Sequence, residues 1–112
     1  MLPKQNRLNL KKDFKWVAAG KRLETKFVTL FLRSGENTEA RVGIANSSKT
    51  FKKAHDRNRA RRVVSAAFEI LYFRLPEKIN IVALPKEGCI EVKSGDVLID
   101  LQEILKNEKI IR

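Results

Sequence analysis

Hydrophobic residues near the start of the chain recur at helical spacing. Leu10, Phe14 and Val17 stand at positions i, i+4 and i+7, and this pattern predicts a helix that follows a short extended stretch. Asn9 is suited to cap its first turn because an Asn side chain accepts a hydrogen bond from a free backbone N–H group. Gly20 lies just past the last periodic position, where helices commonly end.

Extended patterns follow this helix. Residues 26–33 are rich in β-branched and aromatic side chains without helical spacing, which predicts a strand. Residues 34–37 have turn composition, and residues 39–46 predict a second strand, so the two strands are placed to form a hairpin. A third, shorter strand is expected within residues 22–28, either before the first strand or merged with it.

The most regular pattern covers residues 53–73 and predicts a long amphipathic helix. One arc of about 160° on a helical wheel is apolar and holds Ala60, Val63, Val64, Ala67, Phe68, Ile70 and Leu71. The opposite face is polar and is centred on Asn58, Arg61, Arg62, Ser65 and Glu69. We therefore expect this helix to bury one side and expose the other.

The C-terminal part predicts one more strand and one more helix. Residues 79–84 form a nearly continuous apolar run, which is typical of a strand buried on both faces. The last helix has Ser94 or Asp96 as its cap and an apolar stripe of Val97, Leu98, Leu101, Ile104 and Leu105. The order of elements indicates one α/β sandwich domain around a single sheet.

Charge changes this picture because it is concentrated. The chain has 112 residues and a net charge of +11, and residues 49–62 alone carry seven Lys/Arg and one Asp. These cations lie at the start of the predicted amphipathic helix, so they are mounted on a folded element. A rigid basic helix face is suited to a polyanion, and nucleic acid is the first candidate. Arginine forks match phosphate oxygens, and Asn58 is able to bond a base edge or a sugar hydroxyl.

Catalytic and metal-binding patterns are not found. Cys89 is the single cysteine and His55 the single histidine, so no disulfide framework, zinc spacing or catalytic triad is indicated. We therefore expect no catalytic and no metal-ligating residue in the protein itself. No apolar run approaches the roughly 20 residues of a membrane span. These features favour a cytoplasmic protein without a membrane partner.

Several short motifs together resemble the protein component of bacterial ribonuclease P. They occur in the family's order, and the most specific is the RNR helix that follows RVGI and SK. The motifs are LPKxxRL at residues 2–8, DF at 13–14, Gly20, RVGI at 41–44, SK at Ser48 and Lys49, RNRxRR at 57–62 and INIVALP at 79–85. The similarity covers roughly residues 2–105.

This resemblance implies a fold and a function. The implied fold is an α+β two-layer sandwich of α-β-β-β-α-β-α order, similar to the second domain of ribosomal protein S5. The protein is expected to bind a large catalytic RNA, which with Mg²⁺ removes the 5′ leader of precursor tRNA. Mg²⁺ is expected to be held mainly by the RNA and not by the protein alone.

The resemblance also implies two groups of site residues. Those expected to contact the catalytic RNA are Lys49, Lys52, Lys53, Arg57, Asn58, Arg59, Arg61 and Arg62. Those expected to line a cleft for the single-stranded leader are Phe14, Trp16, Phe27, Thr29, Phe31, Arg61 and Ser65. Trp16 has two interpretations, a partly buried packing residue or a stacking platform for a base.

The chain departs from the family pattern at several of these positions. Ser65 and Ala66 replace a usual pair of Arg with Glu or Gln, and Leu30 replaces a frequent Tyr. The family has a second Phe in the cleft near the position that Ala18 or Ala19 occupies here. Trp16 is a candidate to compensate for that missing ring. Residues 50–53 replace a loop of Lys followed by Gly. These departures concern the leader cleft more than the surface for the catalytic RNA.

Two other functions fit parts of the sequence. A ribosomal or RNA-chaperone protein of similar fold is basic in the same way but has no need of precursor tRNA. A protein-only nuclease is disfavoured because no cluster of carboxylates is present to hold metal ions. The sequence leaves self-association open.

Overall fold

All seven expected helices and strands are present in the order α-β-β-β-α-β-α. The computed structural model describes residues 2–47 and 49–111, so Ser48 of the SK motif lies outside the described residues. The helices are α1 (Leu10–Ala18), α2 (Ala54–Leu71) and α3 (Ser94–Asn107). The strands are β1 (Lys21–Glu24), β2 (Val28–Ser34), β3 (Arg41–Ile44) and β4 (Ile79–Pro85). The short third strand is thus a separate element, β1, that precedes β2.

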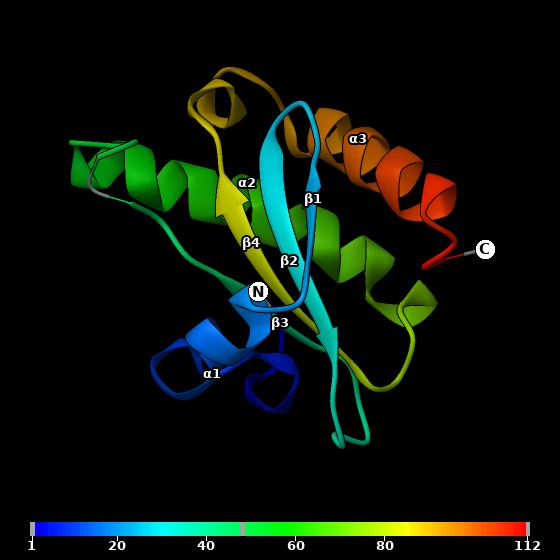
Figure 1. Cartoon of the computed structure of the whole chain (residues 1–112). Coiled ribbons are helices and arrows are strands. Elements are labelled where there is room, and N and C mark those ends of the chain that lie inside the picture. Colours follow the sequence, from blue (N-terminus) through cyan, green and yellow to red (C-terminus); the bar gives the residue numbers. More distant parts are fainter. Residues whose placement is uncertain (1, 48, 112) are drawn as a thin grey trace.

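The four strands form one sheet in the order β1-β2-β4-β3 (Figure 1). β2 pairs antiparallel with both β1 and β4, and β3 pairs parallel with β4. The predicted hairpin between residues 26–33 and 39–46 is therefore wrong. β4 takes the place between them because it is the most apolar strand, and a central position buries both of its faces.

Two hydrophobic clusters lie on opposite faces of the sheet. The larger cluster joins α2 and α3 to the sheet through residues such as Leu30, Ile81 and Phe68. The smaller cluster lies beneath α1 and is centred on Val17 and Val82. Figure 1 shows α2 and α3 together on one side, with α1 lying apart from them. The basic helix and α1 therefore belong to different faces of the sheet.

The buried side of α2 differs from the predicted arc at two positions. Ile70 was expected in the core but is 63% exposed, whereas Ser65 was placed on the polar face and is buried at 5% exposure. The buried line runs through Ala60, Val64 and Leu71. Ser65 lies beside this line and faces the N-terminal segment and β3, where a small hydroxyl side chain fits.

The N-terminal caps predicted for the first and last helices can be compared with the structure. The Asn9 side chain accepts a hydrogen bond from the Lys12 N–H at 3.3 Å, which confirms the cap of α1. The expected cap of α3 is wrong, because Lys93 occupies the cap position and the helix begins at Ser94. The Asp96 carboxylate instead accepts the Lys93 N–H at 3.1 Å from inside the first turn.

The N-terminal segment packs along the free edge of β3. It contains one short turn of helix at Lys4–Asn6, and then the Leu8 N–H donates to the Val42 carbonyl at 3.1 Å. Arg7 forms a parallel bridge with Val42. This segment therefore forms one wall of the space between β3 and α2. No helix among residues 2–47 and 49–111 is long and apolar enough to cross a membrane.

Candidate RNA interface

The predicted cations for RNA gather at the N-terminal half of α2 and in the loop before it. Arg59, Arg61 and Arg62 are exposed together with Asn58, and Arg57 is half-buried. Lys49, Lys52 and Lys53 are exposed in the loop. All eight predicted residues lie in one continuous stretch of the chain, and seven of them are exposed.

Arg57 also holds the loop against the helix. Its Nη1 donates to the Phe51 carbonyl at 2.8 Å and to the Lys52 carbonyl at 3.2 Å. The Asn46 amide donates to the Arg57 carbonyl at 2.9 Å, so the end of β3 is joined to the same turn. Phe51 anchors the loop because its ring is buried. The loop lysines are therefore held at a defined distance from the arginines of α2.

Arg59 is anchored to a different part of the chain. Its Nε donates to the Ile90 carbonyl at 2.8 Å, within the short helix η3 (Glu87–Glu91). This bond leaves the terminal nitrogens of the guanidinium group unused, and they remain on the exposed side of α2. The bond fixes the direction of the side chain, which lowers the entropy lost when a guanidinium group contacts phosphate.

The remaining arginines of this surface have no acidic partner. Within the described chain, no carboxylate forms an ion pair with an arginine of α2. Asp56 lies 3.5 Å from His55, which is itself exposed. A helix face stabilised by its own salt bridges mixes both signs of charge. Residues 49–62 hold seven Lys/Arg against Asp56 alone, so most of this positive charge is available to an outside polyanion.

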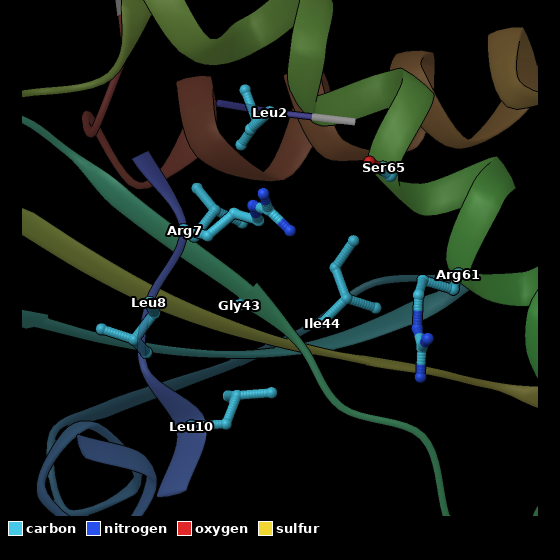
Figure 2. A pocket seen from close by; sticks show the side chains of 9 residues that line it. Leu2, Arg7, Leu8, Leu10, Gly43, Ile44, Arg61 and Ser65 are labelled. Atoms are coloured by element: carbon cyan, nitrogen blue, oxygen red, sulfur yellow. The ribbon is translucent and has the colours of Figure 1, made fainter. Parts of the chain in front are cut away.

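A pocket of about 220 Å³ lies between α2, β3 and the N-terminal segment (Figure 2). Arg61 and Ser65 reach it from α2, and Arg7 reaches it from the N-terminal segment. Figure 2 shows Arg7 and Arg61 on opposite sides of Ile44, whose side chain forms part of the apolar floor. Two guanidinium groups around an apolar floor suit a segment that has both phosphates and bases.

Arg7 is the residue of this pocket that sequence reasoning did not assign. It lies in the N-terminal motif that supported the resemblance, but its charge alone did not separate it from the other 23 Lys and Arg residues. The bridge between Arg7 and Val42 places it opposite α2. That pairing has no local sequence signal because it joins residues 35 positions apart.

The other predicted cleft residues are distributed over the sheet. Phe14 and Phe31 pack in the smaller cluster beneath α1. Thr29 lines a second groove of about 340 Å³ with Ser47 and Thr50, near the basic loop. These residues lie on the sheet face that α1 partly covers, and they do not line the pocket of Arg61 and Ser65.

Phe27 and Trp16 lie away from both spaces. Phe27 was expected to line the leader cleft together with Phe31, but it precedes β2 and packs against the larger cluster. A tight turn, in which the Thr25 N–H donates to the Val28 carbonyl at 2.8 Å, interrupts the alternation of faces. Trp16 lines a third cavity beside the β2–β3 connection. The structure therefore does not bring either residue to Arg61 and Ser65.

The groups suited to catalysis are isolated or inert. Cys89 is fully buried, and burial raises the pKa of its thiol to about 11, so it is held in the unreactive neutral form. His55 extends from the first turn of α2 beside Asp56 only. Among the described residues, no three His, Cys, Asp or Glu side chains are grouped to hold a metal ion. The chemistry that this surface supports is binding of a polyanion by charge.

Comparison with known proteins gives a consistent set of relatives. A family model described as Ribonuclease P matches residues 2–109. A ribonuclease P protein component from Pseudanabaena sp. is 34% identical and covers 99% of this chain and 97% of its own length. A second, from Blochmanniella pennsylvanica, is 31% identical over 92% of this chain and 90% of the relative.

Solved structures support the same relationship. The RNase P protein from Thermotoga maritima is 28% identical, with a TM-score of 0.78 over 90% of this chain and 96% of that chain. A mutant RNase P protein from Staphylococcus aureus has a TM-score of 0.82 over 96% of this chain and 92% of that chain. Its identity of 18% supports the fold alone. The expected fold class is confirmed.

Proposed function

This chain belongs to the ribonuclease P protein component family, and from that premise we propose that it binds the catalytic RNA and the 5′ leader of precursor tRNA. The RNA then cuts the precursor and leaves the mature 5′ end. The family membership makes it an RNA-binding subunit of a tRNA-processing enzyme. Which RNA each surface contacts is the proposed part, and the proposed compartment is the cytoplasm.

The observation that carries the proposal is the row of arginines on α2 that have no acidic partner among the residues that the structure describes. Arg61 and Arg62 are exposed, and Arg57 and Arg59 are oriented by bonds to backbone carbonyls. Phosphates of a folded RNA repel one another. Cations that are fixed on a protein surface lower that repulsion, as free counterions do, but they stay in place next to the RNA. We assign this surface, with Asn58 and the loop lysines, to the catalytic RNA.

The leader follows the spaces beside this surface. Arg61, Ser65 and Arg7 line the pocket between α2 and the N-terminal segment, and Thr29 lines the groove beside the loop. Arg61 belongs to both the helix face and the pocket, so it connects the two RNAs. Phe14 and Phe31 support the sheet under this path from the smaller cluster.

Magnesium is assigned to the RNA subunit. When bound there, it supplies the charge and the activated water that phosphodiester cleavage requires. The protein's part is to place the precursor and to neutralise crowded phosphates. Since fixed cations replace some of the diffuse magnesium that a folded RNA needs, the protein is expected to lower the magnesium concentration required for cleavage.

The test is cleavage of precursor tRNA by the cognate catalytic RNA at low Mg²⁺, with and without the protein. We expect faster cleavage with the protein, and no cleavage by nuclease-free protein alone. A ribosomal or chaperone protein of similar fold binds RNA without this effect on cleavage. An unchanged rate at low Mg²⁺, or metal-dependent cutting by the protein alone, contradicts the proposal.

A further inference from the structure

A broad cavity of about 920 Å³ lies between α1 and the connection from β2 to β3. It is lined by residues of α1, of the strands β2, β3 and β4 and of that connection, and it is separate from the pocket of Arg61 and Ser65. Its lining residues are Lys12, Asp13, Trp16, Ser34, Gly35, Glu36, Asn37, Arg41 and Asn80. The function proposed above makes no use of this cavity.

Trp16 is the main aromatic side chain of this cavity, and it is 39% exposed. The guanidinium carbon of Arg33 lies 4.6 Å from the centroid of the indole ring, and Arg33 Nη1 donates to the Trp16 carbonyl at 3.0 Å. A Cβ atom built on Gly35 would lie 3.0 Å from Trp16 Cη2, so the ring edge rests on this glycine. The ring is therefore held in one orientation with Arg33 over one of its faces, and the residue stays partly exposed.

The charges around the ring favour a nucleotide over an apolar partner. Lys12 and Arg41 are exposed cations that line the cavity, and Lys15 is exposed on the same helix. Asp13 and Glu36 also line it, so the cavity does not attract anions uniformly. Phosphates are expected at the two cations. A base is uncharged, so the nearby carboxylates do not repel it from the ring.

We propose that this cavity binds one unpaired RNA nucleotide, with its base stacked on Trp16 and its phosphates at Lys12 and Arg41. Stacking of a base on an aromatic ring contributes about 1–3 kcal/mol, and the ring here is already oriented before RNA arrives. The site lies on the α1 side of the sheet, whereas the arginine surface is on α2. It is a second RNA contact that goes beyond the leader-binding proposal.

The single tryptophan makes a direct test possible, because all indole fluorescence of the chain comes from Trp16. The full chain is titrated with an unstructured oligocytidylate and with an abasic ribose-phosphate oligomer of equal length. We expect strong quenching by the first and weak quenching by the second, because the phosphates are shared and only the first has bases. Equal quenching by both, or none by either, overturns the proposal.

Variants separate this site from the rest of the RNA interface. With labelled oligocytidylate, Trp16→Leu is expected to weaken binding about tenfold, whereas Trp16→Phe, which retains an aromatic face, weakens it less. The double variant Arg61→Ala/Arg62→Ala is expected to keep the quenching. If that variant abolishes quenching, or if Trp16→Leu and Trp16→Phe weaken binding equally, Trp16 is not an independent stacking site.

The source of the nucleotide is identified by repeating the titration with the two natural RNAs. Quenching by the catalytic RNA alone assigns the nucleotide to that subunit, and quenching only after precursor tRNA is added assigns it to the substrate. Either result supports a stacked nucleotide in the assembled enzyme, and quenching in neither step overturns it. The cleavage assay does not depend on this readout, so a failure here is distinguishable from a failure of the proposed function.

Discussion

The guanidinium group of Arg57 donates to the main-chain oxygen of Phe51 at 2.8 Å. One of the cations expected to contact RNA is thus also a tie between α2 and the loop that precedes it. Arg62, five residues further along the helix, is exposed and has no carboxylate partner among the described residues. The two arginines are the first and last residues of the RNRxRR motif but differ in what their removal should do.

Arg57→Ala is expected to lower both stability and RNA affinity. Loss of hydrogen bonds from a charged donor costs about 1.5 kcal/mol of unfolding free energy. The measurements are urea unfolding of the free protein and binding of the catalytic RNA at several salt concentrations. The loop lysines should also contribute less to binding, because Arg57 no longer holds the loop.

Arg62→Ala is the matched comparison. It should leave the unfolding free energy unchanged and reduce the log–log salt slope of RNA binding by about one. If both variants destabilise the protein equally, the bonds of Arg57 to the loop contribute nothing measurable. If Arg62→Ala leaves affinity and salt slope unchanged, the RNA interface lies elsewhere.

Ser65→Arg is expected to strengthen binding of precursor tRNA by the assembled enzyme. The family pattern has a cation at this position, and Ser65 lines the pocket together with Arg7 and Arg61. A third cation adds roughly one phosphate contact in the complex. In the free protein it meets two like charges, so the unfolding free energy should fall slightly.

Mature tRNA and Ser65→Gln are the controls for this prediction. Mature tRNA has no leader, so its affinity should hardly change at fixed ionic strength. Gln is long and neutral, and it tests whether size alone explains the effect. Equal strengthening of both tRNAs by Ser65→Arg would show that position 65 does not face the leader.

Gly20→Ala is expected to destabilise the domain by about 1–3 kcal/mol. A Cβ atom at this position would clash with the Leu32 carbonyl oxygen and lie 2.9 Å from Arg33 Cβ, so the backbone after α1 must move. Gly95 is the matched control because a Cβ there has no neighbour within 4 Å. Gly95→Ala should leave the unfolding free energy unchanged or raise it by up to about 1 kcal/mol.

Stability is expected to decline between pH 9 and about 11 through Cys89. Burial raises the pKa of this thiol from 9.0 to about 11, so the unfolded chain loses its proton first as the pH rises. This contribution is complete below pH 9 and is lost as the pH passes through the folded pKa. Burial also raises the pKa of Tyr72, which acts in the same direction above pH 10.

Cys89→Ala separates the two groups. Unfolding free energies measured at closely spaced pH values should show a flatter profile between pH 9 and 10 for this variant. The thiol of the native protein should also react with iodoacetamide far more slowly than that of the urea-unfolded chain. An identical slope in both proteins would assign the decline to other groups.

The sequence predicts the elements of this fold better than their arrangement. The apolar run at residues 79–84 and the stripe of the last helix have local periods, and both are found buried. The neighbour of each strand has no such period, since pairing is a competition between distant segments. β4 therefore lies between β2 and β3, which are neighbours in the chain and were expected to pair with each other. The exposure of Ile70 likewise depends on which neighbours α2 meets.

In the RNA interface, too, the features with a local sequence pattern were predicted, and those that depend on distant segments were not. The arginine row was visible because its residues are adjacent in the chain and share one helix. Only the part of the pocket on α2 was predicted, because Arg7 is far from Arg61 and Ser65 in the sequence. Trp16 was expected beside the leader since it belongs to the right helix, but Arg33 and Gly35 hold it at a different cavity. Contacts between side chains remote in sequence decided these cases.

The strand order also determines when this domain is able to fold. β4 lies between β2 and β3 but is the last strand to leave the ribosome. Until about residue 85 has been synthesised, β3 has no neighbouring strand within the sheet and one edge of β2 stays unpaired. Pairing of such distant segments is slow because a long loop must close first. The arginine-rich helix is thus synthesised before the sheet that it packs against is complete.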